Sequence, residues 1–215
     1  MTIQKVGDAA KADKAKKQAK AMKNSGSKAK KDDSASSSTG AVLGAAAAGL
    51  AVGLAANFGR KAVVQGATAM AGDWDQALAA EHKMTLKVFD ALQETDASQK
   101  RKRSALLVQL KHALMKHAVQ EENVVYPAMR EAGKKDEADH LNNDHGYVKQ
   151  YLYELENLAK DSPAFPTKVA KFRSDIEQHM REEEDQLFPS LKTSLDDATN
   201  KKLTLMMNKE GFKAA

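Results

Sequence analysis

The chain has 215 residues, which is enough for one domain of ordinary size with additional tails. It contains no cysteine, which excludes disulfides, thiolate metal ligands and cysteine nucleophiles. The net charge is +5, but ten lysines lie before residue 32, so the remainder is slightly acidic and unlike a basic nucleic-acid-binding domain.

The first 39 residues are rich in lysine, alanine and serine and contain almost no large apolar side chains. Such a segment buries too little surface to offset the entropy that ordering would cost, so residues 1–39 are predicted to form a disordered basic tail. The alternative is an electrostatic arm whose lysines contact anionic lipid or nucleic acid.

Residues 40–59 form an apolar stretch of glycine, alanine and a few larger side chains, and we expect a helix there, followed by a linker to residue 72. The length matches the roughly 20 residues that cross a bilayer. Only six of these residues are strongly apolar, however, so membrane insertion is marginal. Two interpretations stay open: the helix anchors the protein to the inner membrane, or it packs on the domain or on a partner of a cytoplasmic protein.

The most informative feature of the chain is an internal repeat. Residues 117–127 read HAVQEENVVYP and residues 179–189 read HMREEEDQLFP, with a histidine, two carboxylates, an aromatic residue and a proline at the same offsets. A lone histidine precedes each copy, His82 and then His145, and these two are 63 positions apart, whereas the first histidines of the copies are 62 apart. The spacing indicates a two-helix unit duplicated in tandem.

Apolar residues recur with the period of a helix from residue 73 to residue 192, and no stretch alternates with period two. The pattern predicts four amphipathic helices joined by short loops, which is an all-α, up-down-up-down four-helix bundle, and a C-terminal helix and tail in residues 193–215. Gly133 is expected to mark the turn after the second helix. The boundaries expected from capping and breaking residues are Asp73 or Asp75 to about Leu92 for the first helix, a bend or end at Pro127 for the second, and Asp196 or Asp197 to Gly211 for the fifth.

Each helix carries a stripe of side chains that should face the core, and in each stripe a histidine or glutamate stands where a leucine is expected. A buried carboxylate without a partner costs several kcal/mol, so these side chains require compensation. The predicted stripes are Leu78, His82, Thr85 or Leu86, Phe89, Leu92; Leu106, Leu110, Ala113 or Leu114, His117, Glu121, Val124; Leu141, His145, Val148, Leu152, Leu155, Ala159; and Phe172, Ile176, His179, Glu183, Leu187.

Two explanations fit such side chains: core polar residues that bond to one another, or a metal centre. Convergence from all four helices favours the metal centre, and imidazole with carboxylate suits iron, manganese or zinc, with non-haem iron the best match for a site with open positions. Positions i and i+4 share one face of a helix, so each repeat offers a histidine and a glutamate together. Two metal ions would take two histidines each and share two bridging glutamates, from the candidate ligands His82, His117, Glu121, His145, His179 and Glu183.

These residues carry a resemblance to a known family. From about residue 75 to residue 192 the chain resembles the hemerythrin-like HHE cation-binding domain, in which lone histidines on two helices combine with His-x-x-x-Glu on the other two. The resemblance implies a di-iron centre, with two non-haem irons in a four-helix bundle, that binds or senses O2, NO, peroxide or iron. It also implies that the six candidate residues are the iron ligands.

The chain departs from the oxygen-carrying members in two places. Leu141 stands where they have a further histidine, and their spacing on the last helix would select Glu184 in place of Glu183. The lower ligand count favours ligand sensing or turnover over reversible oxygen carriage. His112 and His140 are expected at the surface or near the centre, with His140 the better placed to replace the missing ligand. Neighbouring acids, Glu81, Glu122, Asp144 and Glu184, are candidates for orienting the histidine rings.

Three functions follow. The first is a di-iron protein that binds or senses a small diatomic ligand or peroxide. The second is a di-iron enzyme of peroxide or oxygen detoxification. The third is a structural protein, tethered to a membrane or nucleic acid by residues 1–59, whose metal site is vestigial.

Overall fold

The structure is a computed structural model that describes residues 59, 61, 65–66 and 68–215. The predicted tail (1–39) and nearly all of the predicted Gly/Ala helix (40–59) lie outside the described residues. Within the described part of the chain, secondary structure is entirely helical, and none of its helices combines the length and apolar character needed to span a bilayer.

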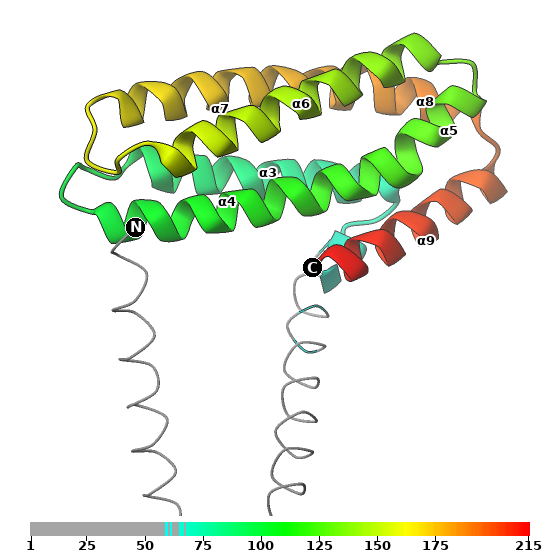
Figure 1. The fold of residues 1–215 in the computed structure, drawn as a ribbon. Helices are drawn as coiled ribbons and strands as arrows, with labels where there is room; N and C mark the ends of the chain where they lie inside the picture. The colour runs from blue at the N-terminus through cyan, green and yellow to red at the C-terminus, as the bar shows by residue number, and fades with distance from the viewer. Residues whose placement is uncertain (1–58, 60, 62–64, 67) are drawn as a thin grey trace, which may run out of the picture. The chain divides into compact units, whose positions relative to one another are not determined.

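Four long helices run antiparallel to their sequence neighbours and enclose one core (Figure 1). The prediction of an all-α, up-down-up-down bundle is therefore confirmed. The first helix begins directly after Asp73, one of its two expected starts, and Gly133 makes the expected turn with a φ of +81°. The bundle helices are α3 (Trp74–Gln93), α4 (Lys100–Gln120), α6 (Lys135–Asn157) and α7 (Ala164–Glu182).

Two of these helices, α4 and α7, are extended beyond their α-helical part. Each continues through a five-residue π turn into a short further helix. The segments are η1 (Glu121–Val125) with α5 (Tyr126–Glu131), and η2 (Glu183–Leu187) with α8 (Phe188–Ser194).

The prolines explain the π turns. A proline inside an α-helix lacks the N–H and its ring collides with the carbonyl four residues earlier. In the wider turn, the N–H before the proline reaches back five residues instead, so Tyr126 N–H donates to the Glu121 carbonyl, and Phe188 N–H donates to the Glu183 carbonyl. A bend or an end of the helix was expected at Pro127; the helix does not end there, because the π turn carries the chain past the proline into α5. Such turns often occur at functional sites.

The apolar core consists of two clusters, with the metal-candidate side chains between them along every bundle helix. One cluster lies toward α5 and α8, and the other fills the end of the bundle where α3 joins α4 and α6 joins α7. The largest fully buried side chains are Trp74, Tyr126, Phe89, Phe165, Phe172 and Phe188. The centre is therefore enclosed by apolar packing at both ends.

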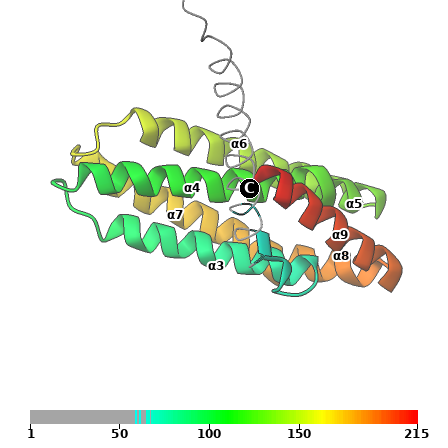
Figure 2. The ribbon, with the colours of Figure 1, turned by 90° about the horizontal axis from the view of Figure 1, so that it is seen from below.

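The C-terminal helix, α9 (Asp197–Ala214), packs across α3, α4 and η1 (Figure 2). Asp196 caps it by accepting a hydrogen bond from Thr199 N–H at 2.7 Å. The predicted end at Gly211 is wrong, and the reason is close packing rather than helix termination. A Cβ at Gly211 would lie 2.4 Å from Gln65 Oε1 and 2.6 Å from the amide of Gln120, so a larger residue there would require both glutamine side chains to move.

The predicted stripes are confirmed for most positions. Where two residues were left open, Thr85 and Leu114 are the buried ones. In α4 the buried position is Leu107, whereas Leu106 is half-buried. Ala159 was predicted to lie in the core, which is wrong: α6 ends at Asn157 and Ala159 is exposed in the loop.

Candidate metal centre

The structure brings all six predicted ligand residues together in the middle of the bundle, and each is at least 95% buried. They form two groups, each with donor atoms within 4.8 Å of one another. Both groups contain Glu121 and Glu183, so these two glutamates lie between two pairs of histidines. The first pair is His82 and His117, and the second is His145 and His179.

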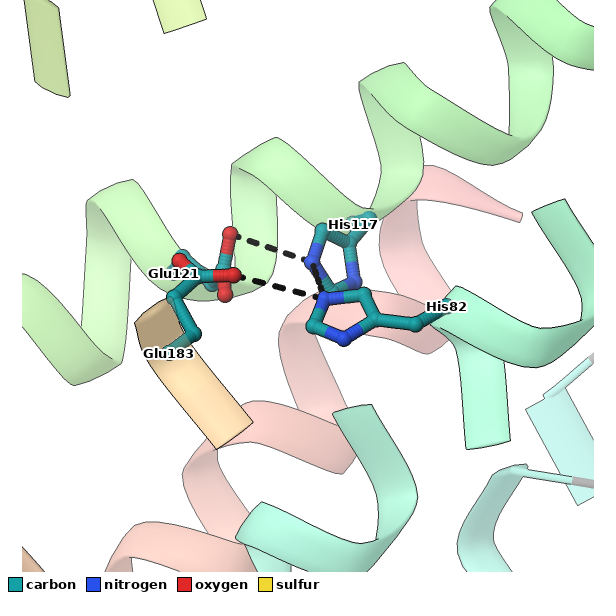
Figure 3. Close-up of side chains that lie close together, drawn as sticks. All are labelled: His82, His117, Glu121 and Glu183. Carbon is teal, nitrogen blue, oxygen red and sulfur yellow. Dashed lines mark hydrogen bonds and ion pairs between the residues drawn. The ribbon is translucent and has the colours of Figure 1, made fainter. Parts of the chain in front are cut away.

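The Nε2 atoms of the four histidines all face the glutamates (Figure 3 shows the first group). Glu121 Oε2 lies 3.2 Å from Nε2 of both His117 and His145. Glu183 directs one oxygen to each pair: Oε2 is 3.4 Å from His82 Nε2, and Oε1 is 3.2 Å from His179 Nε2. This is the arrangement expected of two bridging carboxylates.

A cation fits this donor set, as the hydrogen bonding of the centre indicates. Buried polar atoms normally have partners. Here Glu121 Oε1, His179 Nε2 and Glu183 Oε2 are buried and make no hydrogen bond. His179 Nε2 lacks one even though Glu183 Oε1 lies 3.2 Å away. Imidazole nitrogen and carboxylate oxygen, held together in a buried site, suit first-row transition metals. The role of the six residues as metal ligands stays a prediction.

The opposite nitrogen of every ring, Nδ1, contacts a second carboxylate. Each of these carboxylates belongs to a residue adjacent in sequence to a candidate ligand, but orients the histidine of the next helix. Such contacts fix the tautomer and leave Nε2 free to bind a metal. The pairs are Glu81 with His117 (3.2 Å), Glu122 with His145 (3.0 Å), Asp144 with His179 (3.2 Å) and Glu184 with His82 (2.7 Å).

These four contacts form a closed ring, from α3 to α4, from η1 to α6, from α6 to α7, and from η2 back to α3, where η1 continues α4 and η2 continues α7. We call it the carboxylate ring. The expectation that the neighbouring acids orient histidines agrees with this geometry. It also places Glu183 at the centre and Glu184 on the outside of His82.

One member of the ring is buried with its own counter-charge. Lys116 Nζ lies 2.5 Å from Glu81 Oε1, and both side chains are less than 10% exposed. Lys116 also donates to Thr68 Oγ1 at 3.4 Å, which connects the segment before α3 to the centre. The corresponding acid of the second unit, Asp144, is 29% exposed and has no lysine beside it among its described contacts.

Charge within the centre shifts several pKa values. Burial alone would raise the pKa of the Glu81 carboxyl, but the hydrogen bond and charge of His117, together with Lys116, lower it to about 2. Burial would lower the pKa of His179, but the charge on Glu183 and the hydrogen bond to Asp144 raise it to about 10. Glu81 and His179 are thus stabilised as ions by their neighbours, and a cation held at Nε2 would take the place of a proton.

The two units differ at the aromatic residue before the proline. The Tyr126 hydroxyl, fully buried, lies 3.1 Å from His145 Nε2, 3.2 Å from Glu183 Oε1 and 3.4 Å from Glu121 Oε2. Burial and the charges of both glutamates raise the pKa of this phenol well above its usual value. The equivalent residue, Phe188, stacks on His82 with ring centroids 6.2 Å apart and offers no hydroxyl. The two halves of the centre are therefore chemically unequal.

The remaining predicted residues lie farther out. His112 is exposed on α4, and His140 is 54% exposed on α6, near Asp144 and Glu182. Leu141 is fully buried in the apolar core. Sequence reasoning missed Tyr126 and Lys116 as parts of the site. The difference between tyrosine and phenylalanine at matched repeat positions was the available signal for Tyr126.

Comparison with known proteins places this architecture in a family. A profile of the hemerythrin HHE cation binding domain matches residues 75–191. A DNA nickase from Nostoc sp. (strain PCC 7120 / SAG 25.82 / UTEX 2576) is 25% identical over 134 residues, which are 62% of this chain and 38% of that protein, so the chain spans well under half of its length.

A crystal structure of a hemerythrin HHE cation binding domain-containing protein from Mycobacterium kansasii superposes with a TM-score of 0.59 at 22% identity. The match covers 66% of this chain and 87% of that one, and it supports the fold. Since the profile covers more than half of the sequence and agrees with the bundle, the resemblance is confirmed: the chain belongs to the hemerythrin HHE cation-binding domain family.

Proposed function

We propose that the centre holds two non-haem irons and that the protein binds or senses a small ligand there, namely O2, NO or peroxide. One observation carries the proposal: two groups of buried donors, each with two histidines, share Glu121 and Glu183. Two irons bound there would supply reversible one-electron chemistry and open positions for a ligand.

The surrounding residues would prepare the centre for that role. The carboxylate ring holds each imidazole with Nδ1 occupied and Nε2 directed inward. The Tyr126 hydroxyl can donate a hydrogen bond to an anionic group at the second pair of histidines. Apolar clusters on both sides exclude bulk water, which strengthens each of these electrostatic contacts.

A small cavity beside the centre limits what can bind. It measures about 10 Å³ and is lined by His117, His145 and His179 together with apolar side chains that include Leu114, Ile176 and Met180. That volume is close to the smallest that holds one water molecule. The cavity therefore leaves no room for a large substrate at this face.

Metal content and the visible spectrum of the full chain test the proposal. Reconstitution with Fe(II) without oxygen, followed by exposure to air or peroxide, should give two irons per chain, one for each group, and new visible absorption. His117→Ala should lose both, whereas His112→Ala, an exposed histidine on the same helix, should keep both. Zinc without a visible band, or substoichiometric iron in the unaltered chain, would contradict the proposal and favour a vestigial site.

The second candidate is an enzyme that detoxifies peroxide or oxygen at the same centre. The unequal halves favour it, because Tyr126 places a buried hydroxyl at one group only. An enzyme would release O2 from peroxide, or consume oxygen, over many equivalents without losing iron. A sensor would change its spectrum once per centre and then stop.

A further inference from the structure

A cleft outside the bundle leads to one edge of the centre. It lies between α6 and α7, encloses about 400 Å³, and reaches His179, whose side chain is 95% buried. Three carboxylates line it, Asp144, Asp175 and Glu182, and its described lining includes no lysine or arginine. Asp175 is paired with Lys171 from outside the lining, so Asp144 and Glu182 carry the negative charge. The cleft is therefore acidic and ends at a candidate ligand.

A histidine stands between two of these carboxylates. His140 Nε2 lies 3.5 Å from Glu182 Oε2 on α7 and 3.9 Å from Asp144 Oδ2 on its own helix. Both separations exceed a good hydrogen bond. Donors that share one first-row ion at about 2.1 Å lie roughly 3–3.5 Å apart, so only a small adjustment would let these side chains hold a cation.

The cluster is connected to the interior. Asp144 Oδ2 also contacts His179 Nδ1 at 3.2 Å, so one carboxylate touches both the exposed His140 and the buried His179. His179 Nε2 makes no hydrogen bond, although it is buried. A cation captured by His140 and Glu182 would thus lie beside Asp144, on the Nδ1 side of the imidazole whose Nε2 faces the centre.

We propose that this cleft is the entrance through which Fe(II) reaches the centre. His140 and Glu182 capture the ion at the mouth, and Asp144 passes it to His179 and the second histidine pair. The inference rests on the proposed di-iron function. It assigns to His140 a transient role outside the bound state, in place of a permanent fifth ligand.

A lysine lies beside each of two other members of the carboxylate ring, which makes those positions less favourable for the entry of a cation. Glu81 is buried against Lys116. Glu122 contacts Lys149 Nζ at 3.1 Å. A divalent cation approaching either would be repelled at short range, whereas lysine and arginine are absent from the described lining of the α6–α7 cleft.

The proposal predicts that variants of the cleft change the rates of metal uptake and release but not the amount of metal finally bound. A group on the route stabilises the passing ion and not the bound state, so its loss slows uptake and release by the same factor. For His140→Ala/Glu182→Gln we expect both rates to fall by about tenfold, the scale of local electrostatic focusing. The unaltered chain should also slow as salt is added, and the variant should respond less.

Stopped-flow uptake of Co(II), an optical probe for Fe(II), by the full chain after chelation measures the rate, and metal analysis measures the end point. The matched control is His112→Ala/Glu137→Gln, an exposed histidine and acid outside the cleft, which should behave as the unaltered chain does. Glu182→Lys should slow uptake further by reversing the charge at the mouth.

The outcomes separate the two proposals. Uptake by the His140/Glu182 variant at the unaltered rate would overturn the entrance and leave the di-iron function intact. A lower end point in that variant would make the pair part of the bound site and would also overturn the entrance. Failure of the unaltered chain to bind any metal would overturn both.

Discussion

Each histidine of the centre contacts a carboxylate from another helix, so single residues of the carboxylate ring orient the imidazoles of the centre. Glu81 does this for His117 and is neutralised by Lys116. Residues that orient metal ligands typically contribute 10–100-fold in metal affinity, so their effect is large even though they touch no metal.

Glu81→Gln should therefore weaken binding of the metal by about 10–100-fold, because the amide no longer holds His117 as a charged acceptor. Competition with a chelator of known affinity measures it. Glu137→Gln, an exposed acid on α6, is the control and should bind as the unaltered chain does.

The same substitution leaves Lys116 buried without its partner, which would lower stability for a separate reason. Glu81→Gln combined with Lys116→Met removes that cost. The double variant should recover stability in urea unfolding but not metal affinity. Recovery of both would show that Glu81 acts only through stability.

Tyr126 offers a second prediction for a single residue. Its hydroxyl is close enough to donate to a buried carboxylate of the centre, and a hydrogen bond to a charged group contributes about 1.5–3 kcal/mol. Tyr126→Phe should lower the free energy of unfolding of the chelator-treated protein by about that amount. Phe188→Leu, which removes an aromatic ring but no hydroxyl, serves to separate packing from hydrogen bonding.

At the scale of helices, features that depend on residues close together in the sequence could be predicted, and features that depend on distant contacts could not. The i, i+4 spacing of His117 and Glu121 is local, so the shared face could be predicted. The π turn before Pro127 could not, because an α-helical break and a wider turn both relieve the clash that the proline causes.

Contacts between distant parts of the chain were equally hidden from the sequence. Lysine is a residue type usually found at the surface, but Lys116 is buried, and its amine contacts Glu81 and Thr68. Gly211 was expected to end the helix because glycine often follows the last turn of a helix. In the structure it lies within the helix, in close contact with the side chains of Gln65 and Gln120.

The packing of α9 can be tested with neighbouring methionines. Met207 is fully buried in the core cluster that contains Trp74, so Met207→Ala should cost about 2–5 kcal/mol. Met206 is 42% exposed, and Met206→Ala should change stability by less than about 0.5 kcal/mol. Urea unfolding followed by the fluorescence of Trp74, the one tryptophan of the chain, measures both.

For the whole molecule, we propose that the lysine-rich residues 1–39 contact an anionic surface independently of the centre. Deleting them should abolish salt-sensitive binding to a short DNA duplex or to phosphatidylserine vesicles, because ten lysines are removed, and should leave iron content unchanged. His117→Ala in the full chain should lower the iron content and leave the salt-sensitive binding unchanged. Binding that survives the deletion would place the contact elsewhere in the chain.

The carboxylate ring has a consequence for how such a centre can arise. Every contact in it joins one helix to the next, and the two halves of the chain contribute the same kinds of donor at matched positions. Two separate copies of a single two-helix unit, paired about a twofold axis, would supply an equivalent set. The fused chain gains the freedom to make its halves differ, and Tyr126 opposite Phe188 is where it has done so.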